Sequence, residues 1–331
     1  MSQKNETTLL VLTFAITSML IGGIVLWLIQ HSTTNQNQNP QTASKTVTVA
    51  QSSDFTMIKQ VKNVPSGLIS YGGSTSWAPL RKELDSIIQN TFPQFQLRYT
   101  SPESEAPSST TGINMLLKNQ LEFAQASRPV SKKEYEEAQK RGFQLKEIAI
   151  ALDGLAVVVH PDLKIPGITV DQFEAIFDGK ITNWQQLGGL NIKIQPYGKK
   201  GRDTGNHFKL TETTTEALRL VANDPGGIYW ASAPLLVPQC SVKPLSIDRD
   251  AKKFIPPYKE PLTTQSECRL KNREVNTDAI RSGEYPLTRR LVIVVKQNGN
   301  FEQQIGEAYA NMLLTNEGQE RIARAGFVRL R

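Results

Sequence analysis

The sequence predicts a mixed α/β fold with two lobes, preceded by one transmembrane helix, and three observations carry this prediction. Short apolar runs alternate with helically spaced apolar residues from Val64 onward. The chain has 331 residues, which is enough for two units of about 150 residues each. Residues 9–29 contain no charged side chain. We therefore expect a membrane-anchored α/β protein.

The uncharged run at residues 9–29 is 21 residues long. A helix rises about 1.5 Å per residue, so this run spans a hydrocarbon core of roughly 30 Å. A cleavable signal peptide has a shorter apolar region followed by small residues, and no such site follows this run. A buried core helix is the alternative, which the length disfavours. Residues 1–8 are expected in the cytoplasm, because Lys4 and the amine precede the run and no cation follows before Lys45.

This topology predicts a single-pass protein of the cytoplasmic membrane with its folded part on the extracytoplasmic side. Residues 30–63 are rich in Asn, Gln, Ser and Thr, so burial cannot offset the entropy of ordering them. We expect a flexible linker with an end-to-end distance of roughly 30 Å.

Composition excludes several function classes. The 38 Lys+Arg and 31 Asp+Glu residues leave a net charge of +7, a modest bias that does not indicate nucleic-acid binding. Two cysteines and three widely separated histidines argue against a metal site. No nucleophile-elbow, zincin, Walker A, dinucleotide or EF-hand pattern occurs. We expect no catalytic residues, no metal and no cofactor.

The first lobe is expected to begin with residues 64–152, which contain three strand-to-helix units. The helix after the first strand carries Leu80, Leu84 and Ile88 at helical spacing. The helix after the third opens with a capping-box pair, Ser131 and Glu134. The strands are predicted at residues 67–71, 95–100 and 123–124.

The second lobe is expected at residues 153–284, and residues 285–331 are expected to close the first lobe. The apolar stretch 148–159 suits a strand that crosses between lobes. Thr169 and Gln172 form another capping box. The closing part is predicted as a buried strand at 291–295 and helices at 301–314 and 318–325.

Four polar turns accompany these elements, at residues 72–76, 108–112, 127–130 and 198–205. Hydroxyls and backbone N–H groups at helix N-termini form anion sites, because donors and the positive end of the helix dipole converge there. Taken singly, such Ser and Thr residues are usually only helix caps. Convergence of the four turns would surround a small oxyanion.

Charged groups in these turns can complete such a site. Arg128 and Arg202, with Lys199 and Lys200, are candidate charge-assisted donors. A solvated basic loop is the equal alternative for the two lysines. Asp203 can accept a proton from a ligand, although an Asp before Thr-Gly is more often a turn residue.

The two cysteines, Cys240 and Cys268, lie in a polar stretch of the part assigned to the oxidising side of the membrane. We predict a disulfide between them. Two free thiols are the alternative.

Six segments share motifs with one family of transport proteins. They are GSTSWAP at 73–79, STTGI at 109–113, FAQASRPV at 123–130, IFDGKITNW at 176–184, YPLTR at 285–289 and LLTNEGQ at 313–319. Over residues 67–331 the chain resembles the PstS-like phosphate-binding proteins of ABC transporters, which are type II periplasmic binding proteins. The resemblance implies a two-lobed fold with a hinge.

The resemblance also implies a ligand set. Hydroxyls and backbone N–H groups of Thr75, Ser76 and Ser109 would bind the ligand, with Thr110 in the same loop and Ser127 in the third. Two departures concern specificity. Ser127 stands where phosphate specialists commonly carry an Asp. In the fourth loop Thr204 is retained, but Arg202 and Asp203 replace a Ser-Gly pair.

The leading hypothesis is a membrane-anchored binding protein that captures an oxyanion, inorganic phosphate above all, and presents it to an ABC permease. A rival is a non-transporting regulatory or cell-envelope interaction protein with an altered site, which the permanent anchor and the changed fourth loop favour. An enzyme such as a phosphatase ranks last, because no nucleophile or metal constellation is present.

Overall fold

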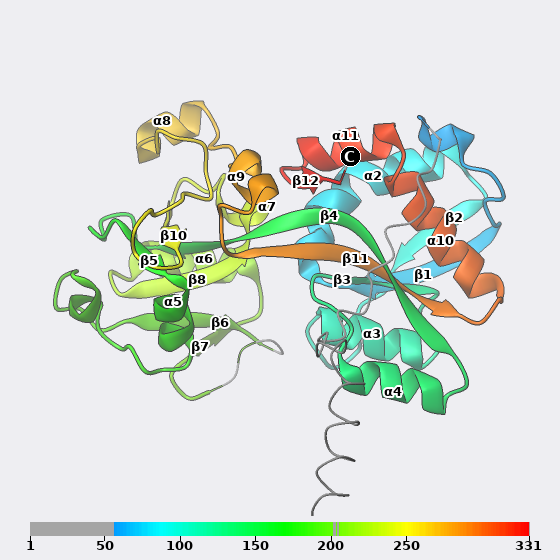
Figure 1. The fold of residues 1–331 in the computed structure, drawn as a ribbon, viewed down its shortest axis with the longest axis horizontal. Helices are drawn as coiled ribbons and strands as arrows, with labels where there is room; N and C mark the ends of the chain where they lie inside the picture. Colours follow the sequence, from blue (N-terminus) through cyan, green and yellow to red (C-terminus); the bar gives the residue numbers. More distant parts are fainter. Residues whose placement is uncertain (1–55, 201–202, 204, 331) are drawn as a thin grey trace, which may run out of the picture. The chain divides into compact units, whose positions relative to one another are not determined.

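The computed structural model describes residues 56–330 except 201, 202 and 204, and these residues form a ten-stranded sheet and a separate two-stranded one (Figure 1). The main strand order is β2-β1-β3-β11-β4-β8-β6-β7, with β9 and β12 paired to β4. The strands are β1 (Gly67–Gly73), β2 (Phe95–Tyr99), β3 (Phe123–Ala126), β4 (Gln144–Val159), β5 (Gly167–Thr169), β6 (Gln195–Lys199), β7 (Lys209–Thr211), β8 (Gly227–Ser232), β9 (Lys243–Pro244), β10 (Ser246–Asp248), β11 (Thr288–Gln297) and β12 (Val328–Arg329).

Helices follow most of these strands. They are η1 (Ile58–Gln60), η2 (Thr75–Trp77), α2 (Ala78–Thr91), α3 (Ser109–Leu117), α4 (Lys132–Lys140), α5 (Val170–Phe177), η3 (Trp184–Leu187), α6 (Thr214–Asn223), α7 (Ala233–Leu236), α8 (Gln265–Leu270), α9 (Thr277–Ser282), α10 (Phe301–Leu313) and α11 (Asn316–Arg324). The capping boxes predicted at the starts of α4 and α5 are confirmed. This mixed α/β architecture agrees with the predicted fold class.

Strand β4 connects two groups of elements, each with its own core. Its first part pairs antiparallel with β11 up to Gly154, and from Leu155 onward it pairs with β8. Figure 1 shows β4 and β11 side by side between the two groups. We call the group with β1, β2 and β3 the first lobe, and the group with β6, β7 and β8 the second lobe. The crossing strand predicted from residue 148 is longer than expected and begins at Gln144.

The first lobe buries both faces of its sheet, because side chains alternate along each strand. Leu291 and Ile293 of β11 pack in one cluster with residues of α2, α10 and α11. Val292 and Val294, on the other face, pack with residues of α3 and α4. The sheet therefore lies between two helical layers, and the loops at its edge are held from both sides.

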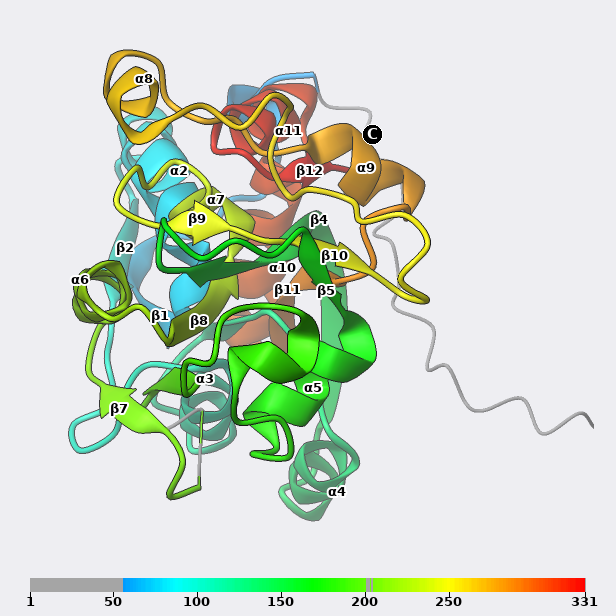
Figure 2. The same ribbon diagram turned by 90° about the vertical axis from the view of Figure 1, so that its left-hand side faces the viewer.

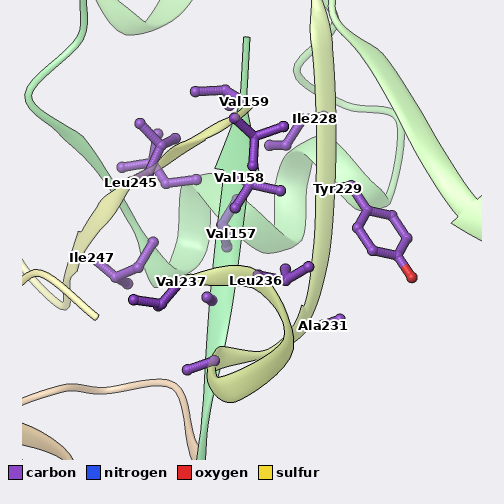
Figure 3. Packing of buried hydrophobic residues seen from close by; sticks show 14 of the residues in the cluster. Val157, Val158, Val159, Ile228, Tyr229, Ala231, Leu236, Val237, Leu245 and Ile247 are labelled. Atoms are coloured by element: carbon purple, nitrogen blue, oxygen red, sulfur yellow. The ribbon is translucent and has the colours of Figure 1, made fainter. Parts of the chain in front are cut away.

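The second lobe has a single core around β4 and β8. Val157 and Val158 of β4 pack with Ile228 of β8 and with Leu236 of α7 (Figure 3). In Figure 2 this lobe faces the viewer, and α6 and α5 lie on either side of β8. A disulfide joins Cys240 to Cys268 with a Cα–Cα distance of 5.6 Å, as predicted.

The folded part begins earlier than the composition suggests. Residues 56–63 belong to the predicted linker, yet Ile58 is completely buried and Val61 nearly so. The backbone N–H of Ile58 also donates to Glu317 at 3.1 Å. Ile58 and Val61, three positions apart, pack in one cluster with residues of α2 and α11, although several of their neighbours in the sequence are polar.

The membrane prediction falls on residues that the structure does not describe. The run at 9–29 lies outside the described residues, as do residues 1–8 and most of the linker. Within residues 56–330, so far as they are described, no helix combines the length and the apolar character that crossing a membrane requires.

Candidate anion-binding site

A pocket of about 330 Å³ lies where the polar turns meet. The first turn, after β1, supplies Ser74, Thr75 and Ser76. The described residues that line the pocket are Ser74, Thr75, Ser76, Pro107, Ser108, Ser109, Thr110, Ser127, Arg128, Lys199, Lys200, Trp230 and Arg289. Parts of all four predicted turns are thus brought together, and the candidate residues Thr75, Ser76, Ser109, Thr110, Ser127 and Arg128 all line one pocket.

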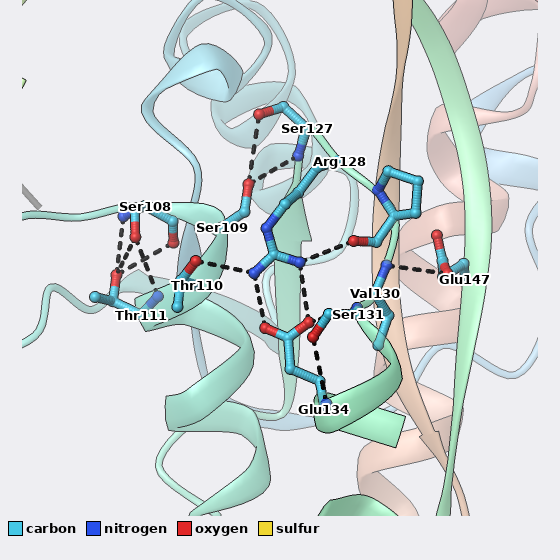
Figure 4. Close-up of polar contacts among 11 residues, drawn as sticks. Ser108, Ser109, Thr110, Thr111, Ser127, Arg128, Val130, Ser131, Glu134 and Glu147 are labelled. Atoms are coloured by element: carbon cyan, nitrogen blue, oxygen red, sulfur yellow. Dashed lines mark hydrogen bonds and ion pairs between the residues drawn. The ribbon is translucent and has the colours of Figure 1, made fainter. Parts of the chain in front are cut away.

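Three buried serines tie the first-lobe turns together. The hydroxyl of Ser127 lies 2.9 Å from that of Ser74 and 3.4 Å from that of Ser109. The backbone N–H of Ser127 donates to the Ser109 hydroxyl at 3.1 Å (Figure 4). A hydroxyl both donates and accepts, so these groups can turn toward an anion without leaving an unpaired acceptor. The cluster is a set of adaptable donors.

The second turn begins a helix rather than preceding one. Helix α3 starts at Ser109, and Ser108 is its N-cap in a capping box with Thr111. The first N–H groups of a helix have no partner within the helix. Ser109 and Thr110 therefore place both their hydroxyls and the positive end of α3 at the pocket.

Arg128 is held in place by an acidic partner. Its guanidinium makes two contacts with Glu134, at 2.7 and 2.9 Å, and donates to the Thr110 hydroxyl at 2.9 Å (Figure 4). Burial alone raises the pKa of Glu134, but hydrogen bonds from Arg128 and Ser131 and the charge of Arg128 outweigh it and lower the pKa. Glu134 thus offsets much of the charge of Arg128 at the pocket edge.

The fourth turn reaches the pocket through its lysines. The Lys199 ammonium, on the second lobe, donates to the Thr75 hydroxyl of the first lobe at 3.0 Å. Lys200 lies nearer solvent and pairs with Glu212 at 3.1 Å. The carboxylate of Asp203 accepts the backbone N–H of Lys199 at 2.7 Å, and Asp203 is not among the lining residues. Arg202 and Thr204 lie outside the described residues.

Three lining residues lie outside the four predicted turns, and sequence reasoning assigned none of them to the site: Pro107, Trp230 and Arg289. Arg289 donates to the Ser76 hydroxyl at 2.7 Å and to the carboxylate of Asp153 at 2.9 and 3.0 Å. Burial raises the pKa of Asp153, although the charge of Arg289 acts in the opposite direction. The only sequence signal for Arg289 was its place in the YPLTR motif. Trp230 carried no signal.

The fold and the pocket together define a two-lobed binding protein. Residues 31–317 match the PBP superfamily domain, and the chain belongs to this superfamily. Like the solute-binding proteins that it matches, the chain is not an enzyme.

Individual relatives agree with this assignment. The chain is 26% identical over 275 residues to the phosphate-binding protein PstS of Borreliella burgdorferi, covering 79% of this chain and 89% of that protein. A putative phosphate ABC transporter substrate-binding protein from Clostridium perfringens has the same fold, with a TM-score of 0.62, 20% identity and coverage of 80% of this chain and 100% of that one. An ABC-type phosphate transport receptor from Vibrio cholerae also has this fold, with a TM-score of 0.58 and 21% sequence identity. The match covers 78% of this chain and 99% of that one.

Proposed function

We propose that this chain captures an oxyanion, inorganic phosphate above all, in the pocket and presents it to an ABC permease. The chemistry of the pocket carries the proposal. Hydroxyls from three turns face four cationic side chains, and the described lining includes no carboxylate. Hydrogen bonds from charged donors to an anion are stronger than hydrogen bonds between neutral groups. The name of the Borreliella relative and the phosphate bound in the Clostridium structure support phosphate as the ligand.

Ligand capture involves both lobes. The first lobe contributes its three hydroxyl-bearing turns, and the second contributes Lys199 and Trp230. An anion that accepts hydrogen bonds from both sides favours the arrangement in which the lobes are close together. The hydrogen bond from Lys199 of the second lobe to Thr75 of the first lobe joins the two lobes at the pocket.

The anchor is part of the proposal. Residues 9–29 hold the protein in the cytoplasmic membrane as a single span, with the binding lobes on the extracytoplasmic side. The disulfide between Cys240 and Cys268 supports an oxidising compartment. Mass spectrometry of protein extracted from membranes should find an intact N-terminus. A mature chain that starts beyond Gln30 as the sole form would contradict the anchor.

Calorimetric titration of the full-length protein in detergent tests the binding function, with phosphate, sulfate and a phosphate monoester as ligands. Thr75→Ala and Ser109→Ala should each weaken phosphate binding about ten- to a hundredfold, because each removes a hydrogen bond to a charged ligand. Thr215→Ala, at an exposed threonine outside the pocket, is the matched control. If wild-type protein binds none of the anions, the transport proposal fails and a regulatory or cell-envelope role is favoured.

A further inference from the structure

The buried pair of Arg289 and Asp153 lies at the junction of the two lobes. The two residues stand directly opposite each other on β11 and β4. Along β4, Asp153 and Gly154 are the last two residues that pair with β11, and Leu155 is the first that pairs with β8. The Asp153 side chain is completely buried, whereas that of Arg289 is 20% exposed. The exposed part of the pair is therefore the cation, at the pocket.

Every oxygen of the buried carboxylate has a partner. Oδ2 accepts both contacts from Arg289, and Oδ1 accepts the hydroxyl of Ser232 at 2.6 Å. Ser232 is the last residue of β8 in the second lobe. A buried ion pair contributes little to stability compared with apolar residues of similar size. A role in positioning explains the pair better than a role in stability.

Arg289 retains donor capacity on the pocket side. Its Nε and Nη2 groups bind Asp153, and Nη2 also donates to Ser76. Among the described residues, no hydrogen bond involves Nη1. A guanidinium carries five N–H donors in a planar fork, which suits bidentate recognition of an oxyanion. By contrast, Arg128 already directs both ends of its fork to Glu134.

We propose that Arg289 is a ligand-binding residue of the pocket and that Asp153 positions it while tying it to Ser232 of the second lobe. This inference rests on the proposed anion-binding function. The hydrogen bonds run from Ser232 through Asp153 and Arg289 to Ser76, from the second lobe to the first turn of the first lobe. An anion that binds Arg289 therefore contacts a group whose position both lobes determine.

Titration of the full-length protein with inorganic phosphate tests the ligand role. Arg289→Met should weaken binding about ten- to a hundredfold, because it removes a charged donor. Arg290→Met removes the same charge one residue further along β11, where the side chain is exposed and faces the other side of the strand, and should change affinity less than about twofold. Arg289→Lys should give an intermediate loss, because one ammonium cannot serve Asp153, Ser76 and the anion together.

The positioning role of Asp153 is tested by a double-mutant cycle on phosphate affinity. Asp153→Asn should weaken binding in wild-type protein and have no further effect when Arg289 is already Met. Circular dichroism verifies folding, and the neutral variant Arg289→Gln replaces Arg289→Met in the cycle if the latter does not fold. Phosphate binding that is equal in Arg289→Met and Arg290→Met, or additive effects in the cycle, would overturn the inference while leaving the proposed function intact. Wild-type protein that binds no anion would instead contradict the proposed function.

Discussion

Gly112 of α3 and Gly73 of β1 lie so close that a Cβ atom added to Gly112 would be 2.5 Å from the Cα of Gly73. Gly73 itself has a φ of 126°, a conformation that favours glycine. These two residues allow the first and second turns to approach each other. The arrangement of Ser74 beside Ser109 and Ser127 depends on this close approach of two backbones.

Replacing Gly112 with Ala is therefore expected to destabilise the protein and to weaken anion binding. The methyl group must push the first turn away from α3, which should lower the free energy of unfolding by about 1 to 3 kcal/mol. Urea unfolding and phosphate titration measure the two effects. Asn114→Ala, at an exposed position of the same helix, is the control and should change stability by less than about 0.5 kcal/mol. Equal behaviour of the two variants would show that the close approach is unimportant.

Removing the disulfide should reduce stability without abolishing the pocket. Cys240 and Cys268 are 28 residues apart, and closing a loop of that length contributes about 3 to 4 kcal/mol in the chain-entropy model. The double variant Cys240→Ser with Cys268→Ser should lose this amount in urea unfolding. Neither cysteine lines the pocket, so phosphate affinity of the folded variant should be unchanged. A large loss of affinity would indicate coupling between the disulfide and the site.

The pair of Glu134 and Arg128 predicts a pH-dependent contribution to stability. The pKa of Glu134 lies below its ordinary value of 4.5, so folding favours the ionised form. The stabilisation is therefore complete above about pH 4.5 and is lost as the pH falls through the lower pKa of the folded protein. Glu134→Gln should cost about 1 to 2 kcal/mol at pH 7, and the difference from wild type should shrink in acid.

Chemical unfolding at pH 7 and at pH values below 4.5 measures this dependence. Glu136→Gln, on the same helix, removes an exposed carboxylate whose contact with Lys132 is 3.7 Å long, and should have little effect at either pH. If the loss in free energy of unfolding caused by Glu134→Gln is the same at both pH values, the ion pair is not the source of that loss.

Weak discrimination between phosphate and sulfate is expected from the lining of the pocket. A carboxylate rejects sulfate, because sulfate has no proton to donate, whereas a hydroxyl can donate to either anion. The Asp203 carboxylate instead accepts the N–H of Lys199. Competition titration should give affinities for the two anions within about tenfold of each other, and Asp203→Asn should leave their ratio unchanged. A strong phosphate preference that Asp203→Asn removes would place this carboxylate at the ligand.

Local patterns in the sequence were sufficient for most strands and helices of the first lobe, and for few of those in the second. A continuous apolar run predicted the buried strand at 291–295, and the pairs Ser131–Glu134 and Thr169–Gln172 predicted two helix starts that the structure confirms. These features depend on residues a few positions apart, and the same short-range chemistry operates in any fold. The hydroxyl-rich turns were recognisable for the same reason.

Tertiary structure alone decided which groups meet. Arg289 and Asp153 are 136 positions apart, and only the register of β11 against β4 places them opposite each other. Ile58 is buried in one cluster with residues of α2 and α11, and its backbone N–H donates to Glu317, 259 positions away. The sequence thus determined where donors occur along the chain, because capping and turn formation are local. The pairing of strands determined which donors share a pocket, because that choice depends on contacts between distant segments.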